Sequence, residues 1–164
     1  MSDVERVQKA TFVQPPLQLE ESFYDHVEID ALKDYQRQAY ESEKPELLEV
    51  DVNLASLEAG PNKWEVRLDV RLEPDEDLPL PPYRLGLRAF GHFRVPLGSE
   101  DADTARMVAV NGASILFSSM REYLMLITSR GLWGPVTLPT VSFAGLEVEE
   151  RDGEPSAVQE DDGN

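Results

Sequence analysis

Three stretches of the sequence alternate apolar and polar residues. In residues 63–73 every second residue is apolar and all the others are charged. Residues 48–54 alternate in the same way, although Asn53 is polar and uncharged. Residues 83–95 alternate with minor breaks. Because successive side chains of a strand point to opposite faces, each stretch predicts a strand with one buried face. The link 58–62 contains Gly and Pro, so the first two strands form an antiparallel hairpin.

Two proline-containing segments flank this pattern. Residues 11–24 predict a fourth, irregular strand, and Pro15 and Pro16 place it at an edge or at a bend, since proline lacks a backbone N–H. Residues 74–82 form a proline-rich connection.

The period changes from two to that of a helix after residue 100. Asp101 or Asp103 can cap a helix that begins near Thr104, and Gly131 ends it as a C-cap glycine. One apolar stripe of this helix covers the sheet. Four further apolar residues lie off the stripe and predict a second covering surface, which we expect to be another subunit. These predicted interface residues are Ile115, Phe117, Met125 and Leu126.

Strands followed by a helix predict an α+β fold with an antiparallel sheet. We expect residues 1–146 to form one domain. Residues 147–164 hold almost no large apolar residues and predict an acidic, disordered tail.

Composition narrows the function. The 164 residues carry a net charge of -17, with the excess acid in the first 60 residues and in the tail, which disfavours nucleic acid and anionic membranes as partners. Cysteine is absent, so no disulfide or thiolate metal site is expected. No apolar run is long enough to span a membrane and no secretory signal is apparent, so we expect a cytoplasmic protein.

Few residues suggest catalysis. His26 and His92 lie far apart in the sequence, and adjacent acids such as Glu20 and Glu21 are typical of a solvated surface. No phosphate-binding glycine loop is present. We therefore predict a protein that is not an enzyme and needs no metal or cofactor.

One segment loosely resembles a strand of RNA-recognition domains. Residues 88–95 read "RAFGHFRV", but Phe90 and Phe93 have opposite parity and point to opposite faces. The net charge is also unfavourable for RNA, so this interpretation is set aside.

An apolar pair follows the predicted helix. Leu132 and Trp133 lie in "SRGLWGPVTLP", between two glycines and two prolines. The pair is either packed against the body of the protein or available to a partner. Surplus apolar surface of this kind indicates an oligomer or a binding site for apolar segments.

Residues 115–146 resemble the signature of the SecB family of export chaperones. That signature reads I-L-F-P-Y-x-R-E, then S-R-G, a short apolar run and P-V-N-F-x-x-L. Ser118 and Ser119 replace its Pro-Tyr pair. The weaker likeness of the strands extends the resemblance to about residues 11–146. The matching residues are Ile115, Leu116, Phe117, Arg121, Glu122, Ser129, Arg130, Gly131, Leu138, Val141, Phe143 and Leu146.

The resemblance implies a four-stranded antiparallel sheet followed by a long helix and a short C-terminal helix. It implies a homotetramer, a dimer of dimers with the helices between the sheets. It also implies ATP-independent holding of unfolded preproteins in apolar grooves and their delivery to SecA. Some SecB-like proteins instead guard an antitoxin, and a client-free structural oligomer is a further alternative.

The resemblance also suggests site residues. SecA docking would use the acids Glu20, Glu21 and Asp25, although other family acids fall on Tyr24 and Gly86. Trp133 could instead be a core residue. The candidate groove residues are Val50, Val52, Leu54, Leu132, Trp133 and Leu138.

Overall fold

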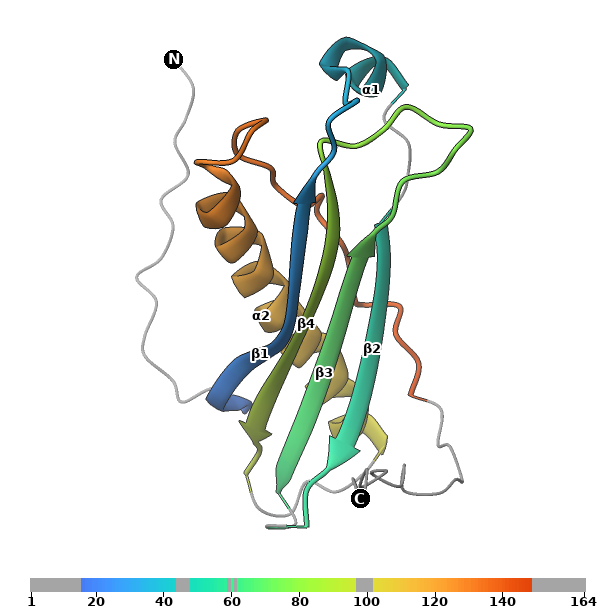
Figure 1. Ribbon diagram of the computed structural model, residues 1–164. Coiled ribbons are helices and arrows are strands. Elements are labelled where there is room, and N and C mark those ends of the chain that lie inside the picture. The colour runs from blue at the N-terminus through green and yellow to red at the C-terminus, as the bar shows by residue number, and fades with distance from the viewer. Residues whose placement is uncertain (1–15, 44–47, 59, 61, 97–101, 149–164) are drawn as a thin grey trace, which may run out of the picture.

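The fold is a four-stranded antiparallel sheet with one long helix across one face (Figure 1). This computed structural model describes residues 16–43, 48–58, 60, 62–96 and 102–148. The sheet order is β1-β4-β3-β2, so β1 and β2 are its edges. None of the described helices is long and apolar enough to cross a membrane. The elements are β1 (Gln18–Ala31), α1 (Arg37–Glu43), β2 (Leu48–Ser56), β3 (Lys63–Leu72), β4 (Tyr83–Arg94) and α2 (Ala102–Thr128).

The predicted hairpin is confirmed. β2 pairs with β3 without interruption, from Leu48 opposite Leu72 to Ser56 opposite Trp64. Because opposed residues of an antiparallel pair share a face, the apolar rows of the two strands combine into one surface. β4 extends that surface on the other side of β3, from Leu85 opposite Leu72 to Phe93 opposite Trp64.

The core lies between this surface and α2. Val66, Leu68 and Val70 of β3 have no exposed area, and Leu116 and Met120 of α2 are at most 1% exposed. The alternation of β3 and β4 therefore did separate the buried face from the exposed one. The opposite side of the sheet, which α2 does not cover, is called the outer face below.

β1 differs from its prediction in both bounds. It runs from Gln18 to Ala31, whereas residues 11–24 were expected to form it. Its pairing with β4 shifts between Leu19 and Glu21 and again between Tyr24 and His26. Each bulge moves one extra residue into the strand and resets the alternation, which explains why the sequence pattern is irregular there. Its position at an edge agrees with the prediction.

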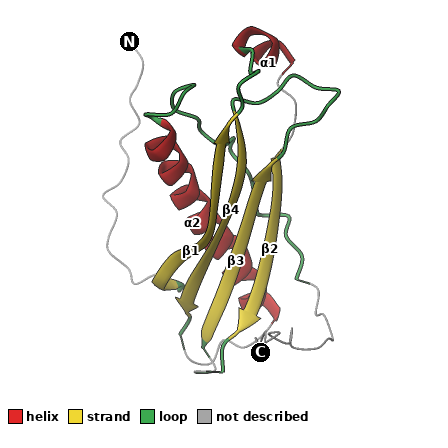
Figure 2. Ribbon diagram, viewed as in Figure 1, coloured by secondary structure: helices red, strands yellow, loops and turns green. Residues whose placement is uncertain are grey.

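The chain after α2 returns along the molecule without helix or strand (Figure 2). We call residues 129–137 the upper loop and residues 138–148 the strap. The short C-terminal helix that the resemblance implies is not formed by the strap, and residues 149–164 lie outside the described residues. α2 itself begins at Ala102, close to the expected Thr104. The seven-residue α1 was not predicted.

Gly131 does not act as the left-handed C-cap that we expected. Among the described glycines only Gly134 has a positive φ, of 82°. A Cβ atom on Gly131 would overlap the hydroxyl oxygen of Tyr83, so the absence of a side chain is what this position requires.

Candidate functional site

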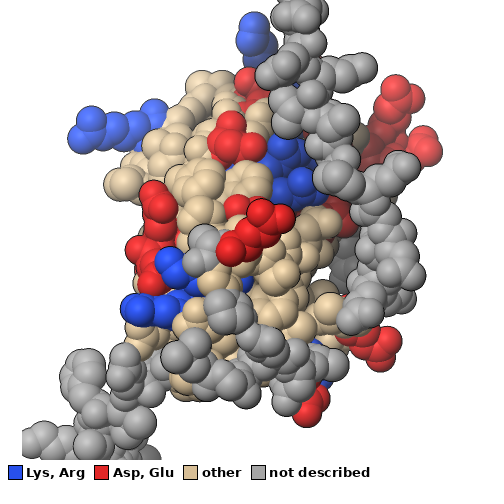
Figure 3. Space-filling view, turned by 90° about the horizontal axis from the view of Figure 1, so that it is seen from below, with Lys and Arg blue, Asp and Glu red and all other residues tan. Residues whose placement is uncertain are grey.

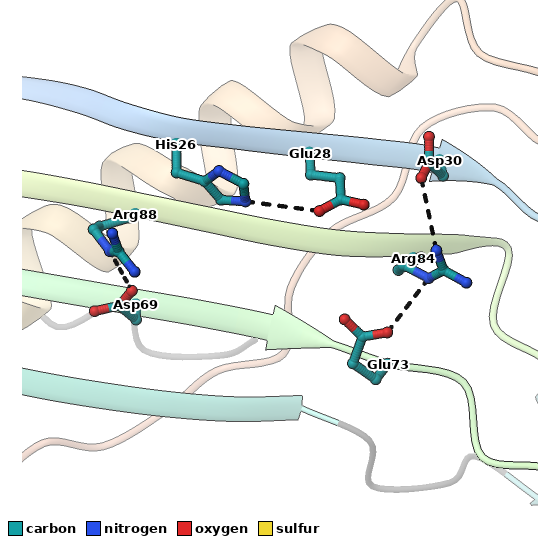
Figure 4. Close-up of polar contacts among 7 residues, drawn as sticks. All are labelled: His26, Glu28, Asp30, Asp69, Glu73, Arg84 and Arg88. Carbon is teal, nitrogen blue, oxygen red and sulfur yellow. Dashed lines mark hydrogen bonds and ion pairs between the residues drawn. The ribbon is translucent and has the colours of Figure 1, made fainter. Parts of the chain in front are cut away.

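The outer face of the sheet is a network of ion pairs. Asp69 lies at its centre, with Oδ1 2.6 Å from Arg88 Nε and Oδ2 3.0 Å from Arg67 Nε. Its side chain is 5% exposed. The hydrogen bond to Asp69 is the main reason why the pKa of Arg88 is raised above its ordinary value. Figure 4 shows this pair and, nearer the start of β4, Arg84 between Asp30 and Glu73.

The three acids proposed for SecA docking all belong to this network. Glu20 lies 3.0 Å from Arg94 and 3.5 Å from Lys63. Glu21 lies 3.6 Å from His92. Asp25 lies 3.7 Å from Arg88. Glu20 and Asp25 therefore already have a cationic neighbour within the protein and Glu21 has a histidine, so the surface they share is mixed in charge.

Charges of both signs also meet at the lower end of the molecule. Figure 3 shows acidic and basic side chains there beside broad areas of other residues. On the face formed by β1, β4 and β3 the ion pairs place acids beside bases, so that face presents no field of a single sign to a partner.

The two histidines stay apart. His26 lies 3.7 Å from Glu28, and His92 lies 3.0 Å from Glu65. The rings of Phe23 and Phe90 stack at 5.3 Å on the same outer face, and His92 meets Phe23 edge-on at 5.6 Å. Among the described residues no three His, Cys, Asp or Glu side chains are arranged to hold a metal ion.

The upper loop is fixed by Trp133 and Tyr83. The Tyr83 hydroxyl accepts a hydrogen bond from Trp133 N at 3.0 Å and donates one to Gly134 O at 3.1 Å. Trp133 Nε1 donates to the carbonyl oxygen of Leu32 at 2.9 Å. The Trp133 ring also meets that of Tyr35 edge-on, with centroids 5.3 Å apart. The loop is thereby tied to both β4 and the segment that follows β1.

The apolar pair of the upper loop is divided between two environments. Trp133 is half-buried against the core, whereas Leu132 remains 66% exposed. The contacts of Trp133 position Leu132 at the surface. The loop therefore combines a fixed aromatic ring with a free aliphatic side chain.

A cavity of about 540 Å³ opens at the other end of the sheet. We call it the lower cavity. It lies between the end of β2, the start of α2 and the end of the strap. Its lining residues are Val52, Asn53, Leu54, Ser56, Trp64, Ala105, Ala109, Leu146, Glu147 and Val148.

Two arginines of α2 hold the strap that forms one wall of this cavity. Arg121 Nε donates to Leu138 O at 3.0 Å. Arg106 donates to Ala144 O at 2.8 Å and to Leu146 O at 3.2 Å. Guanidinium-to-carbonyl bonds are charge-assisted, so they fix an extended segment that forms no ladder.

The six candidate groove residues divide among these places. Val52 and Leu54 line the lower cavity, and Val50 is half-buried on the same strand. Leu132 and Trp133 belong to the upper loop. Leu138 is 1% exposed and belongs to the core.

The cavity lining includes residues that were not proposed for the groove. They are Trp64, Ala105, Ala109, Leu146 and Val148. The alternation assigned Trp64 to the buried face. The sequence around Trp64 does not show that Ala105 and Ala109 line the same cavity.

The predicted interface residues of α2 divide as well. Ile115, Met125 and Leu126 are 39%, 46% and 71% exposed. Phe117 is only 4% exposed, because Phe143 of the strap packs edge-on against it at 5.7 Å. The chain itself therefore covers one of the four residues for which we expected a second subunit.

The sheet order, the long helix across one face and the extended segment behind it define a SecB-like fold. The structure is similar to that of Rv1957, a SecB-like chaperone of Mycobacterium tuberculosis in complex with a ChAD peptide from the Rv1956 HigA1 antitoxin. The TM-score is 0.59 at 16% sequence identity, over 77% of this chain and 91% of that one.

A protein of unknown function from Streptococcus agalactiae is also similar. It is 15% identical, with a TM-score of 0.48, over 76% of this chain and 97% of the other. No protein-family model matches the chain, and no curated protein matches it. The likeness to solved structures therefore concerns the fold.

Proposed function

We propose that the protein is an ATP-independent chaperone that binds unfolded or precursor polypeptides through apolar surface. The observation that carries the proposal is the row of half-buried apolar side chains on the edge strand β2, of which Val52 and Leu54 open into the lower cavity. Burial of client side chains there supplies about 25 cal/mol per Å² of apolar area and requires no directional chemistry. Such a mechanism uses no nucleotide, metal or cofactor.

The upper loop extends the proposed client surface. Leu132 is 66% exposed beside the fixed Trp133, so it can contact a client without a rearrangement of the loop. We propose that a long client occupies both ends of the molecule, with Val50 between them. Leu138 would then support the surface from beneath rather than contact the client.

We also propose a homotetramer. Ile115, Met125 and Leu126 form an exposed apolar face on α2, and Leu19 and Val27 are 41% and 44% exposed on β1. Exposed apolar residues gathered on one helix and one edge strand are typical of surfaces that another subunit covers. Light scattering should give four times the chain mass of 18.4 kDa.

A chaperone dedicated to an antitoxin is the second candidate. The complex of the similar Mycobacterium tuberculosis chaperone with an antitoxin peptide favours it. Delivery to SecA is less well supported, because a basic partner would have to compete with Arg94 for Glu20 and with Arg88 for Asp25.

The test is suppression of aggregation. A chemically unfolded protein is diluted into buffer without nucleotide, with and without a molar excess of the tetramer. We expect light scattering by the diluted protein to fall in proportion to the chaperone added. Unchanged aggregation at every ratio would overturn the proposal of a general holdase; binding of an antitoxin peptide by the same sample would leave the second candidate.

A further inference from the structure

We infer that β1 is a salt-sensitive edge strand: ion pairs to β4, rather than apolar burial, hold it against the sheet, so that a rise in ionic strength releases it. The inference concerns a conformational change within the fold and does not depend on client binding. Three observations carry it: the exposure of β1, the positions of its acids and the arginines that these acids meet.

β1 contributes little to the core. None of its 14 residues is buried, and Leu19, Phe23 and Val27 are each at least 40% exposed. Only Tyr24 and Ile29 of this strand pack partly against the core. The neighbouring strand β4, by contrast, has buried side chains along its whole length. The hydrophobic contribution, which scales with the apolar area removed from water, is therefore small for β1.

Acids connect β1 to β4 at three points on the outer face. The contacts lie near the start, the middle and the end of the strand, so they are distributed over its length. The three pairs are Glu20–Arg94 at 3.0 Å, Asp25–Arg88 at 3.7 Å and Asp30–Arg84 at 4.0 Å.

The two bulges of β1 place two of these acids. The pairing with β4 shifts at Glu20 and again at Asp25. Each bulge gives the outer face one more side chain than regular alternation would, and in both cases that side chain is a carboxylate beside an arginine. The irregularities that interrupt the backbone ladder are therefore the places where ion pairs are added.

Two of the arginines are also held from the other side. Asp69 of β3 lies 2.6 Å from Arg88, and Glu73, just after β3, lies 3.3 Å from Arg84 (Figure 4). An arginine that is already ordered loses little further conformational freedom when an acid of β1 pairs with it, so a network is more favourable than isolated pairs. The three acids of β1 are nevertheless 30–58% exposed, and salt can screen them.

Release of β1 uncovers the edge of β4. This 12-residue strand pairs with β3 without a register shift. The free backbone groups of a regular edge can pair with another extended segment. The ion pairs of β1 therefore determine whether this edge of the sheet is closed or open to a further strand.

Hydrogen exchange of backbone amides in the full chain, at fixed pH, tests the inference. The screening length falls from about 10 Å at 0.1 M salt to about 3 Å at 1 M, which is comparable with the separations of the ion pairs. We expect the amides of β1 to exchange at least fivefold faster at the higher concentration. Those of β2 should change less than twofold, because half-buried apolar side chains hold that edge. Equal responses of the two edges would overturn the inference.

Glu20→Gln and Glu28→Gln provide a matched comparison, because each removes one charge from β1 with the same small change of shape. Glu28 faces Gly86 in the pairing, and its ion-pair neighbour among the described residues is His26 of the same strand. At 0.1 M salt Glu20→Gln should speed exchange of β1 about threefold, whereas Glu28→Gln should match the wild type. Equal exchange in the two variants would overturn the inference. Asp25→Asn, with the same expected result as Glu20→Gln, replaces it if that variant folds poorly.

Light scattering on the same samples separates this inference from an effect of assembly. If a second copy that covers Leu19 and Val27 holds β1 in place, exchange of β1 will depend on protein concentration and follow the loss of mass, and the inference fails. Faster exchange of β1 at high salt with an unchanged mass supports the inference.

Discussion

The two tryptophans of the protein differ in the hydrogen bonding of their indole N–H groups. Trp133, in the upper loop, has its indole N–H bonded to Leu32 O and its backbone N–H bonded to Tyr83. Trp64, at the lower end, has a buried indole N–H without an acceptor among the described residues and lines a cavity. Both rings are half-buried beside the same core.

This contrast distinguishes a residue that stabilises its own loop from a residue that is available to a binding partner. An indole whose N–H is hydrogen-bonded holds its own segment in place, so Trp133 contributes to the stability of the upper loop. The indole N–H of Trp64 is buried beside a cavity without an acceptor, which is unfavourable, so a partner that supplies an acceptor there would be stabilised. The two rings are similarly buried, and only their hydrogen bonding shows that they have different roles.

The largest expected effect is loss of the Trp133 ring. Trp133→Ala removes the bond to Leu32, the contact with Tyr35 and the apolar burial of the ring. We expect the free energy of unfolding to fall by about 2–4 kcal/mol, somewhat less than for a fully buried tryptophan. Urea denaturation measures it. A loss below about 0.5 kcal/mol would mean that the ring does not fasten the loop.

A pair of Trp→Phe variants should sharpen the comparison. Trp133→Phe leaves the carbonyl of Leu32 without its donor and should cost about 1–2 kcal/mol of unfolding free energy. Trp64→Phe removes a donor that had no acceptor, so stability should stay the same or rise slightly. Parallel thermal and urea denaturation would show it. Equal losses in both variants would remove the distinction.

Tyr83→Phe probes the second fastening of the upper loop. The hydroxyl both accepts from Trp133 N and donates to Gly134 O. Its removal should cost about 1 kcal/mol, since the loop polar groups can regain water. Urea denaturation measures the loss, and an unchanged free energy of unfolding would show that the hydroxyl does not stabilise the loop.

Salt should have the smallest effect. Charges near the surface are screened over roughly 8 Å at physiological ionic strength. The stability difference between Trp133→Phe and wild type should nevertheless stay constant between low and physiological salt, because the hydrogen bond to Leu32 O joins uncharged groups. Denaturation at the two salt concentrations provides the comparison, and a difference that shrinks as salt rises would contradict it.

The parts of the fold that the sequence predicted are those in which one face is covered and the other is not. β3 and β4 meet this condition along their length, so their alternation is visible. β1 does not, because its two bulges reset the parity. α1 was missed because seven residues carry too few turns for a period to emerge.

The candidate site was predicted only in part, because its shape depends on long-range packing. Val52 and Leu54 were among the groove residues that the resemblance suggested, and both line the lower cavity. The space before them depends on Ala105 and Ala109, about fifty residues later in the chain. Phe117 likewise looked available to a partner, since no local pattern shows that Phe143 returns to cover it.

The two edges of the sheet differ in how readily another strand can pair with them. β1 is broken by bulges, which make it a poor template for another strand. β2 is regular along all nine residues and can template an added strand. Its exposed side chains include Glu49 and Asp51, whose like charges oppose stacking of identical chains. Bulges therefore disfavour the addition of a further strand at one edge of the sheet, and like charges disfavour it at the other.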